Sequence, residues 1–334
     1  MGMAQELREA PQALRSQPGE LAAPLAELTA RLKRRPPQLV MTCARGSSAH
    51  AATFAKHAIE LYLGIPVAAA APNIASVYHR RLRLEGQLFL AISQSGRSDD
   101  LVESAAMAKA AGALTAALVN ATDSPLAAAC DIILPMGAGA ELSVAATKSF
   151  VASLAALLRL VALWTDDERL QAALDRLPQR VAAAGELDWS PALEAFAAAP
   201  SLITIGRGPT LAIAREAALK LKEIANLHAE AFSGAEFLHG PVALVAARYP
   251  ILILLPADEA AVGMRRLVTE LGAKGAALFT AGPDGALAVV AADHPETDAI
   301  CLIQSFYAMA ARLAEQLGID PDRPRHLHKV TRTR

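Results

Sequence analysis

The 334-residue sequence is poor in aromatic residues, cysteine and net charge. Only 4% of its residues are Phe, Trp or Tyr, and the formal net charge is −1. A chain with so little net charge has no bulk affinity for nucleic acid or for an anionic membrane, so we expect neither as a partner. The three cysteines lie far apart, and the eight histidines contain no HExxH pattern, so no metal site is expected.

The cysteine positions and the apolar runs also bear on the cellular compartment. Cys43 and Cys130 lie in apolar, strand-like runs, which predicts buried thiols in a reducing environment. The N-terminus is polar and charged, unlike a signal peptide. The longest uncharged run, 61–78, contains two prolines and an asparagine and would make a poor membrane span. We therefore expect a cytoplasmic protein.

The sequence is rich in alanine and other apolar residues, and short β-type runs alternate with helical patterns. This alternation predicts parallel sheets covered by helices. The second half of the chain repeats the first, since strand-like runs end in the pairs Arg45-Gly46 and Arg207-Gly208, which are 162 residues apart. The following strands keep nearly the same offset, and they are expected at 88–92 and 251–255, and at 114–119 and 277–281.

The repeat predicts an α/β protein with two tandem, doubly wound domains, each built on a parallel sheet. The expected parts are a helical arm at 3–34, a first domain at 35–165, a helical linker at 166–194, a second domain at 195–318 and a C-terminal tail at 319–334. In open α/β sheets, ligands bind at the carboxyl ends of the strands. The loops that follow the strands are therefore expected to carry the functional site.

A turn rich in hydroxyl groups follows the expected strand at 88–92. It runs from Ser93 to Ser98 with the sequence Ser-Gln-Ser-Gly-Arg-Ser and leads into a helix that opens with two aspartates. Hydroxyls and unpaired backbone N–H groups at a helix N-terminus can hold a phosphate monoester without lysine. The alternative is an ordinary helix start, with Ser98 as the N-cap. No Gly-Lys-Ser/Thr follows, which distinguishes the turn from a P-loop.

A second candidate lies on the helix expected over 211–230. At 100° per residue, Glu216, Lys220 and Glu223 share one face of this helix. One interpretation is a solvated face stabilised by a Glu–Lys pair; the other is a carboxylate base held beside an ammonium and facing a site. His239 follows on a Gly-Pro turn, where a lone histidine is either a structural residue or a catalyst.

Several segments occur together in an order that resembles a known family. The resemblance is to the double SIS (sugar isomerase) unit of glutamine–fructose-6-phosphate aminotransferase, and it extends from about residue 38 to 331. The segments are Ser93–Gly96, Glu141–Lys148, Leu219–Ile224, His228–Ala231, Leu238–Pro241 and the tail Arg323–Thr331.

The aminotransferases also carry an N-terminal glutaminase domain with a cysteine nucleophile, and this sequence has no counterpart of it. We therefore expect no glutaminase activity. The resemblance is closer to stand-alone SIS-type glucosamine-6-phosphate deaminases, which implies conversion of glucosamine 6-phosphate and water into fructose 6-phosphate and ammonia. Alternatives are a deaminase or deglycase for galactosamine 6-phosphate or fructosamine 6-phosphate, and a sugar-phosphate-binding regulator.

The resemblance also implies roles for individual residues. Glu223 would move a proton between C1 and C2, Lys220 would flank it, and Glu216 would order the same site. His239 would assist ring opening from a neighbouring subunit of a homodimer, and Lys329 would engage the sugar carbonyl. The residues that would bind the phosphate are Ser48, Ser93, Gln94, Ser95 and Ser98, and those that would bind the rest of the substrate are Glu141 and Val144. The implied partner is a small-molecule sugar phosphate, with no cofactor.

The sequence departs from the family pattern at a few positions. Ala146 replaces a serine of the first ligand loop, which implies the loss of one hydrogen bond, and Ser47 replaces a threonine. His326 and His328 replace asparagine and alanine in the tail, which leaves open how the tail docks. A basic C-terminal segment is otherwise often disordered.

Overall fold

The computed structural model describes residues 2–329, which divide into two compact units. The first-sheet unit holds 12–141, 148–175 and the end of the described chain from 328. The second-sheet unit holds the first residues of the chain up to 11, then 142–147 and 176–327. The end of the expected tail, 330–334, lies outside the described residues. The domain boundaries expected from the sequence remain a prediction.

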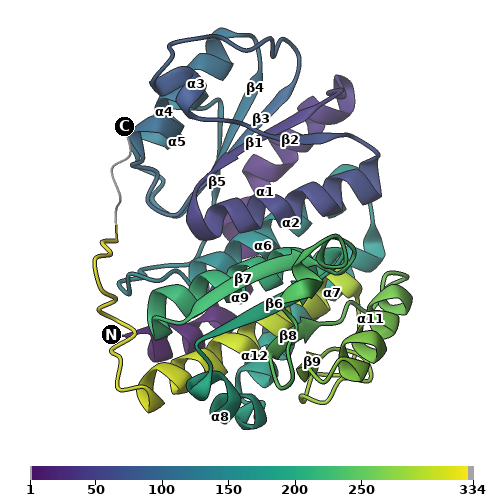
Figure 1. The fold of residues 1–334 in the computed structure, drawn as a ribbon. Helices are drawn as coiled ribbons and strands as arrows, with labels where there is room; N and C mark the ends of the chain where they lie inside the picture. Colours follow the sequence, from purple (N-terminus) through teal and green to yellow (C-terminus); the bar gives the residue numbers. More distant parts are fainter. Residues whose placement is uncertain (1, 330–334) are drawn as a thin grey trace. The chain divides into compact units, whose positions relative to one another are not determined.

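The first-sheet unit is built on a five-stranded parallel sheet with the strand order β2-β1-β3-β4-β5 (Figure 1). Its strands are β1 (Val40–Ala44), β2 (Val67–Ala69), β3 (Leu88–Ser93), β4 (Leu114–Val119) and β5 (Ile132–Pro135). Its helices are α2 (Gly46–Leu63), α3 (Asn73–Ser76), α4 (Asp99–Ala110), α5 (Pro125–Ala129) and α6 (Lys148–Thr165). Every residue of β3 is buried, as expected for a central strand covered on both faces.

The order of the strands reverses between β1 and β3. Ala44 pairs with Ile92, so the loops that follow these two strands leave the same edge of the sheet side by side. Doubly wound sheets bind their ligands at such a switch point. The fold therefore puts the loop after β1 next to the serine turn, which we define as residues Ser93–Ser98.

The second-sheet unit has a four-stranded parallel sheet in the order β7-β6-β8-β9, which repeats the same winding. Its strands are β6 (Ser201–Gly206), β7 (His228–Ser233), β8 (Pro250–Leu254) and β9 (Ala277–Ala281). Its helices are α8 (Ser190–Ala198), α9 (Pro209–Ala225), α10 (Gly234–Phe237), the 3-10 helix η1 (Pro241–Leu244), α11 (Ala261–Ala273) and α12 (Pro295–Gln316). These two sheets confirm the prediction of a doubly wound α/β protein.

One predicted helix is wrong at its C-terminal end. The helix expected over 211–230 is α9, which ends at Ala225. Asn226 follows with a φ of 50°, a left-handed conformation that ends helices. The next residues form the edge strand β7, whose burial alternates at first between exposed and buried positions.

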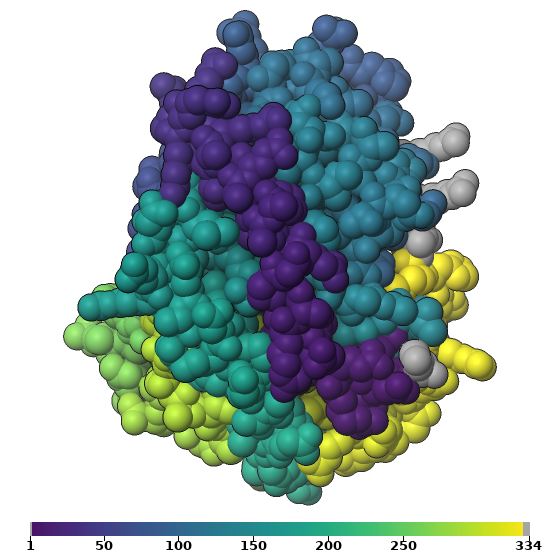
Figure 2. Space-filling model, turned by 180° about the vertical axis from the view of Figure 1, so that it is seen from behind, coloured from purple at the N-terminus to yellow at the C-terminus, as the bar shows by residue number. Residues whose placement is uncertain are grey.

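Two long helices complete the chain, α1 (Met3–Arg34) and α7 (Glu168–Gly185), and each contributes residues to both units. Figure 2 shows α1 in purple at the molecular surface. Its inner face carries leucines that recur every three to four residues, among them Leu21, Leu25, Leu28 and Leu32. Helix α1 covers the residues for which a helical arm was expected.

Helix α6 is long and apolar enough to cross a membrane by length and composition alone. However, 83% of its 18-residue window is buried, and it packs against α2. This burial is the pattern of a core helix in a globular unit.

Candidate active site

The serine turn closes on itself at the end of β3. Ser93 Oγ accepts a hydrogen bond from the Gly96 N–H at 3.1 Å, and Ser95 Oγ accepts one from the Arg97 N–H at 3.3 Å. The carbonyl of Gln94 accepts backbone N–H groups of the loop after β4. Ser98 is the N-cap of α4, but its side chain makes no capping hydrogen bond. The alternative interpretation expected the Ser98 hydroxyl to cap α4, and the structure shows no such hydrogen bond.

Glycine is required at position 96. Gly96 has a φ of 61°, and a Cβ atom there would lie 2.0 Å from Ser124 Oγ. A side chain would therefore combine backbone strain with a clash against the loop before α5. The tight path of the turn depends on this residue.

The loop after β1 brings a second helix N-terminus to the same edge. Ser48 lies in the first turn of α2, and Arg45, the N-cap, makes no side-chain capping bond. The first N–H groups of a helix have no intrahelical partner and carry the positive end of its dipole. Two helices, α2 and α4, thus start at the switch point of one sheet, an arrangement suited to an anion.

An ion pair that the sequence did not predict joins these two helix starts. Arg45 Nε and one of its terminal nitrogens donate to Asp100 Oδ2 at 3.0 and 2.7 Å. Asp100 is 2% exposed, and Arg45 comes from the neighbouring loop. The pair holds the two loops together. Sequence reasoning had placed this aspartate only in the first turn of its helix.

Glu141 and Lys329 lie together in the first-sheet unit. Glu141 is buried, and its two carboxylate oxygens accept the backbone N–H and the hydroxyl of Ser149 at 3.0 and 2.5 Å. Lys329 Nζ lies 3.2 Å from Glu141 Oε2, and its side chain is 25% exposed. Glu141 therefore anchors the N-terminus of α6 and holds Lys329, and its contact with the substrate stays a prediction.

The charged face of α9 is buried in the second-sheet unit. Glu216 and Lys220 are each 0% exposed as residues, whereas the Glu223 side chain is 22% exposed. Lys220 Nζ lies 3.3 Å from Glu216 Oε1 and 2.5 Å from Glu223 Oε2. The solvated-face interpretation is therefore wrong. One ammonium joins two carboxylates, and only Glu223 has access to solvent.

The cluster is completed from α12 and keeps Lys220 charged. Tyr307 Oη donates to Glu216 Oε1 at 3.1 Å. Burial by itself lowers the pKa of Lys220, but the charges and hydrogen bonds of Glu216 and Glu223 outweigh it and raise that pKa above its usual value. Sequence reasoning missed Tyr307, because its contact with α9 joins segments far apart in the chain.

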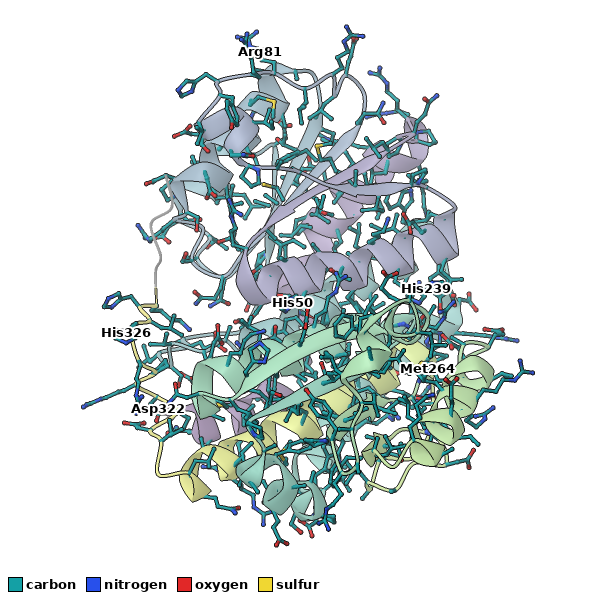
Figure 3. The ribbon with its side chains drawn as sticks, viewed as in Figure 1. His50, Arg81, His239, Met264, Asp322 and His326 are labelled. Carbon is teal, nitrogen blue, oxygen red and sulfur yellow. The ribbon has the colours of Figure 1, made fainter. Side chains whose placement is uncertain are left out.

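His239 lies in the turn between α10 and η1, in an exposed position labelled in Figure 3. The next residue, Gly240, has a φ of 142° and precedes Pro241. The prediction that His239 sits on a Gly-Pro turn is confirmed. An exposed histidine on a fixed turn is available to a ligand or to another subunit.

Val144 lies in the segment 142–147, which belongs to the second-sheet unit. Its neighbours are held by two acidic residues that sequence reasoning missed. The carboxylate of Glu6, 0% exposed, accepts the N–H groups of Leu142 and Ser143, and Asp322 Oδ1 accepts the hydroxyl of Ser143 at 3.0 Å. These contacts fix the loop that carries Val144, which is itself half-buried.

All three cysteines are buried, as predicted for Cys43 and Cys130. Burial raises the pKa of Cys43 to about 12, that of Cys130 to about 11 and that of Cys301 to about 12. Within residues 2–329, no group of three or more His, Cys, Asp or Glu side chains is arranged to hold a metal ion.

The structure thus sorts the candidate residues into two sets. The first-sheet unit gathers Ser48 and the serine turn at one sheet edge and holds Lys329 on Glu141. The second-sheet unit gathers Glu216, Lys220 and Glu223, and it also contains Val144 and His239.

Comparison with known proteins places the chain in a family. A family model described as SIS domain matches residues 37–163 and 195–294. A glutamine–fructose-6-phosphate aminotransferase (isomerizing) from Treponema pallidum (strain Nichols) is 35% identical over 325 residues, which cover 87% of this chain and 51% of that protein. The chain spans about half the length of the curated relatives it matches.

Solved structures show the same fold. A protein named "putative phosphosugar isomerase" from Silicibacter pomeroyi DSS-3 is 44% identical, with a TM-score of 0.91 over 96% of this chain and 100% of that one. The C-terminal domain of glucosamine-fructose-6-phosphate aminotransferase from Francisella tularensis is 28% identical, with a TM-score of 0.85 over 96% of this chain and 98% of that one. Since the family model matches well over half of its residues, the chain belongs to the SIS-domain family.

Proposed function

We propose that the protein is a sugar-phosphate isomerase that deaminates an amino-sugar 6-phosphate. The proposed reaction converts glucosamine 6-phosphate and water into fructose 6-phosphate and ammonia. The observation that carries the proposal is the cluster on α9, in which Lys220 is buried between two carboxylates and only Glu223 reaches solvent. A carboxylate held beside an ammonium stays ionised and can accept a proton from carbon.

The chemistry needs one base that reaches two adjacent carbons. In the open-chain aminoaldose, Glu223 takes the proton from C2 and returns it to C1, while the nitrogen loses a proton and O1 gains one. The product is an imine at C2, to which water adds as ammonia leaves, giving fructose 6-phosphate. The reaction needs no oxidant or reductant. Lys220 stabilises the negative charge that develops on O1 during the proton transfer.

The serine turn and Ser48 are proposed to bind the 6-phosphate. Two helix starts and several hydroxyls at one sheet edge supply neutral donors, and Arg45 is occupied by Asp100. Lys329, held on Glu141, is proposed to engage the sugar carbonyl. His239 is proposed to act in ring opening from the second subunit of a homodimer, for which its exposed turn is suited.

The burial of the three cysteine thiols supports the proposal that this chain does not hydrolyse glutamine. A glutaminase of the kind found in the aminotransferases needs a reactive thiolate. All three thiols are buried, and burial holds the pKa of Cys43, Cys130 and Cys301 well above neutral pH. This chain is therefore proposed to release ammonia from the amino sugar and none from glutamine.

The decisive experiment measures ammonia release by the purified chain from glucosamine 6-phosphate, galactosamine 6-phosphate, fructosamine 6-phosphate and glutamine. We expect turnover of glucosamine 6-phosphate, none of glutamine, and loss of turnover in Glu223→Gln. Faster turnover of another amino sugar would identify that sugar as the substrate and would still support the proposed type of reaction. Tight binding of fructose 6-phosphate with no turnover of any sugar would favour a regulatory protein instead.

A further inference from the structure

The second-sheet unit contains a cavity of about 220 Å³ at the carboxyl ends of β8 and β9. It lies beside the switch point of its own sheet, where the strand order reverses between β6 and β8. Its walls come from the loops after β8 and β9, the start of α9, the segment 289–292 and one face of α12. None of the residues to which a catalytic or phosphate-binding role is proposed lines it.

The internal repeat identifies this cavity as the counterpart of the proposed phosphate site. Adding the 162-residue offset to Ser48 gives Thr210, and adding it to Ser93, Gln94 and Ser95 gives Leu255, Pro256 and Ala257. All four of these counterparts line the cavity. The cavity thus lies at the place in its winding that the loop after β1 and the serine turn occupy in the first-sheet unit.

The counterpart has lost the donors that would hold a phosphate. The hydroxyls of Ser93 and Ser95 are replaced by apolar side chains. Proline stands in the loop after β8, at Pro256, and at the first position of α9, at Pro209, and proline has no N–H to donate. A phosphate in this cavity would therefore be desolvated with fewer compensating hydrogen bonds than the serine turn offers.

The polar side chains that remain in the wall are already paired. Thr210 Oγ1 donates to the Leu254 carbonyl at 2.7 Å, and Ser305 Oγ donates to the Ala184 carbonyl at 2.8 Å. Asp298 Oδ1 accepts from Arg180 at 2.7 Å. The rest of the surface is mainly Val, Ala, Leu and Pro. The cavity therefore favours an uncharged, apolar occupant.

The cavity is open and its wall is held in place. Ala291 and Ala292, which form part of the wall, are exposed, so the cavity is accessible from solvent. The segment that contains them is fixed by Trp189 Nε1, which donates to the Ala288 carbonyl at 2.7 Å, and by Arg180, which donates to that of Ala291. A pre-formed apolar cavity of this kind is typical of a small-molecule site.

We propose that this cavity binds a small, uncharged, apolar molecule about the size of a substituted benzene ring. An apolar cavity of about 150 Å³ is enough to bind benzene in another protein. The repeat has thus produced one sheet edge with hydroxyl donors for a phosphate and an equivalent edge whose cavity lacks them. The cavity is a site for a different class of ligand.

An occupant of this site would contact both helices that hold the α9 cluster. Thr210 lies in the first turn of α9, which carries Glu216, and the α12 residues in the wall lie on the helix whose Tyr307 donates to Glu216. We therefore expect binding to change kcat more than the KM for sugar phosphate. This last expectation rests on the proposed function, whereas binding itself is measured without substrate.

The test uses fluorobenzene as the probe and its ¹⁹F NMR line width as the readout, with the whole chain in solution. Wild-type protein should broaden the line saturably, and neither inorganic phosphate nor fructose 6-phosphate should reverse the broadening. Ala257→Phe, which fills the cavity from the loop after β8, should abolish it. Ala273→Phe, at an exposed position of α11 outside the cavity, should retain it.

A second filling variant, Ala291→Phe, sits on the exposed wall and keeps the test valid if Ala257→Phe does not fold. Circular dichroism establishes the fold of each variant. Absence of saturable broadening with folded wild-type protein would overturn the proposal. So would binding that survives in a folded filling variant, or displacement of the probe by phosphate. A protein that binds fluorobenzene but turns over no sugar would leave this site standing and reject only the proposed function.

Discussion

Lys220 and Glu223 form an ion pair that reaches from the interior of the second-sheet unit to its surface. Their charged atoms lie 2.5 Å apart, with the lysine side chain 1% exposed and the glutamate side chain 22% exposed. Glu216, 3.3 Å from the same ammonium, is fully buried. Of the two carboxylates, only Glu223 is placed to meet a substrate.

Replacing Glu223 by glutamine should abolish proton transfer and spare binding. The amide keeps the shape of the side chain but cannot accept a proton from carbon, and loss of a general base costs about 10²–10⁴ in rate. We expect kcat to fall by this factor, with a nearly unchanged affinity for fructose 6-phosphate. Exchange of solvent deuterium into C1 of fructose 6-phosphate should also stop.

The matched control is Glu270→Gln, at an exposed position on α11, which should behave as wild type. If Glu223→Gln exchanges deuterium at the wild-type rate, another residue is the base. Glu216 would then be the next candidate, because it contacts the same ammonium.

Removal of the Lys220 charge should destabilise the fold. Lys220→Met leaves Glu216 buried without its cation, and breaking a buried ion pair on one side costs about 3–5 kcal/mol. We expect the unfolding free energy to fall by that amount, which urea unfolding measures as a lower midpoint. Lys222→Met is the control, since Lys222 is an exposed lysine on the same helix that donates to the Ala229 carbonyl. An equal loss of unfolding free energy in both variants would contradict the prediction, because it would show that the buried lysine stabilises the fold no more than the exposed one.

The sequence predicted this face of α9 correctly but not its surroundings. The 3.6-residue period is a local property, so the alignment of Glu216, Lys220 and Glu223 follows from their spacing. Whether that face is solvated depends on what covers it. The cover includes α12, whose Tyr307 is distant in sequence, and no local pattern predicts that contact.

The same limit explains what was missed elsewhere. Alternation of strands and helices, together with the repeat, was enough to predict two parallel sheets. The first residues of the edge strand β7 were mistaken for the end of a helix, because the strand is short and its polar and apolar residues alternate only over 228–231. The Arg45–Asp100 pair joins loops that become neighbours only when β1 pairs with β3.

Loss of the serine-turn hydroxyls should weaken phosphate binding. In Ser93→Ala/Ser95→Ala, each lost hydrogen bond to a charged group is worth roughly 1.5–3 kcal/mol, although each hydroxyl also accepts a backbone N–H within the turn. Calorimetry should show at least about tenfold weaker binding of fructose 6-phosphate, a change of about 1.4 kcal/mol. Ser16→Ala, at an exposed position on α1, should bind normally. Unchanged affinity in the folded double variant would remove the turn from the site.

The buried thiols predict a stability that declines at alkaline pH. Free thiols have a pKa of 9.0, whereas burial raises the pKa of Cys43 and Cys301 to about 12 and that of Cys130 to about 11. The native state therefore keeps these protons at pH values where the unfolded chain releases them. Their contribution to the unfolding free energy is complete below pH 9 and is lost as pH rises through the native pKa values.

Urea unfolding at pH 8 and at pH 10.5 measures this decline. A variant with alanine at all three cysteine positions should lose part of the difference between the two pH values. At pH 8 the folded wild type should react slowly with a thiol reagent, and all three thiols should react in urea. Rapid labelling of the native protein would show that the thiols are accessible.

Lys329 should be needed for turnover and should matter less for folding than Lys220 does. Its ammonium lies 3.2 Å from Glu141 Oε2, and its side chain is still 25% exposed, so the pair can hold the lysine in place while leaving it available to a sugar carbonyl. Glu141 is buried, but it keeps both of its hydrogen bonds from Ser149 when the lysine is removed, so Lys329→Met should stay folded and lose less stability than Lys220→Met. If the lysine engages the carbonyl, kcat should fall by at least about tenfold, equivalent to 1.36 kcal/mol of transition-state stabilisation.

The control is Lys109→Met, which removes the cation of another ion pair in the same unit, with Asp131, and should leave kcat unchanged. Full activity in Lys329→Met would return the C-terminal segment to a passive role, and an equal loss of kcat in both variants would point to general electrostatics instead of contact with the substrate.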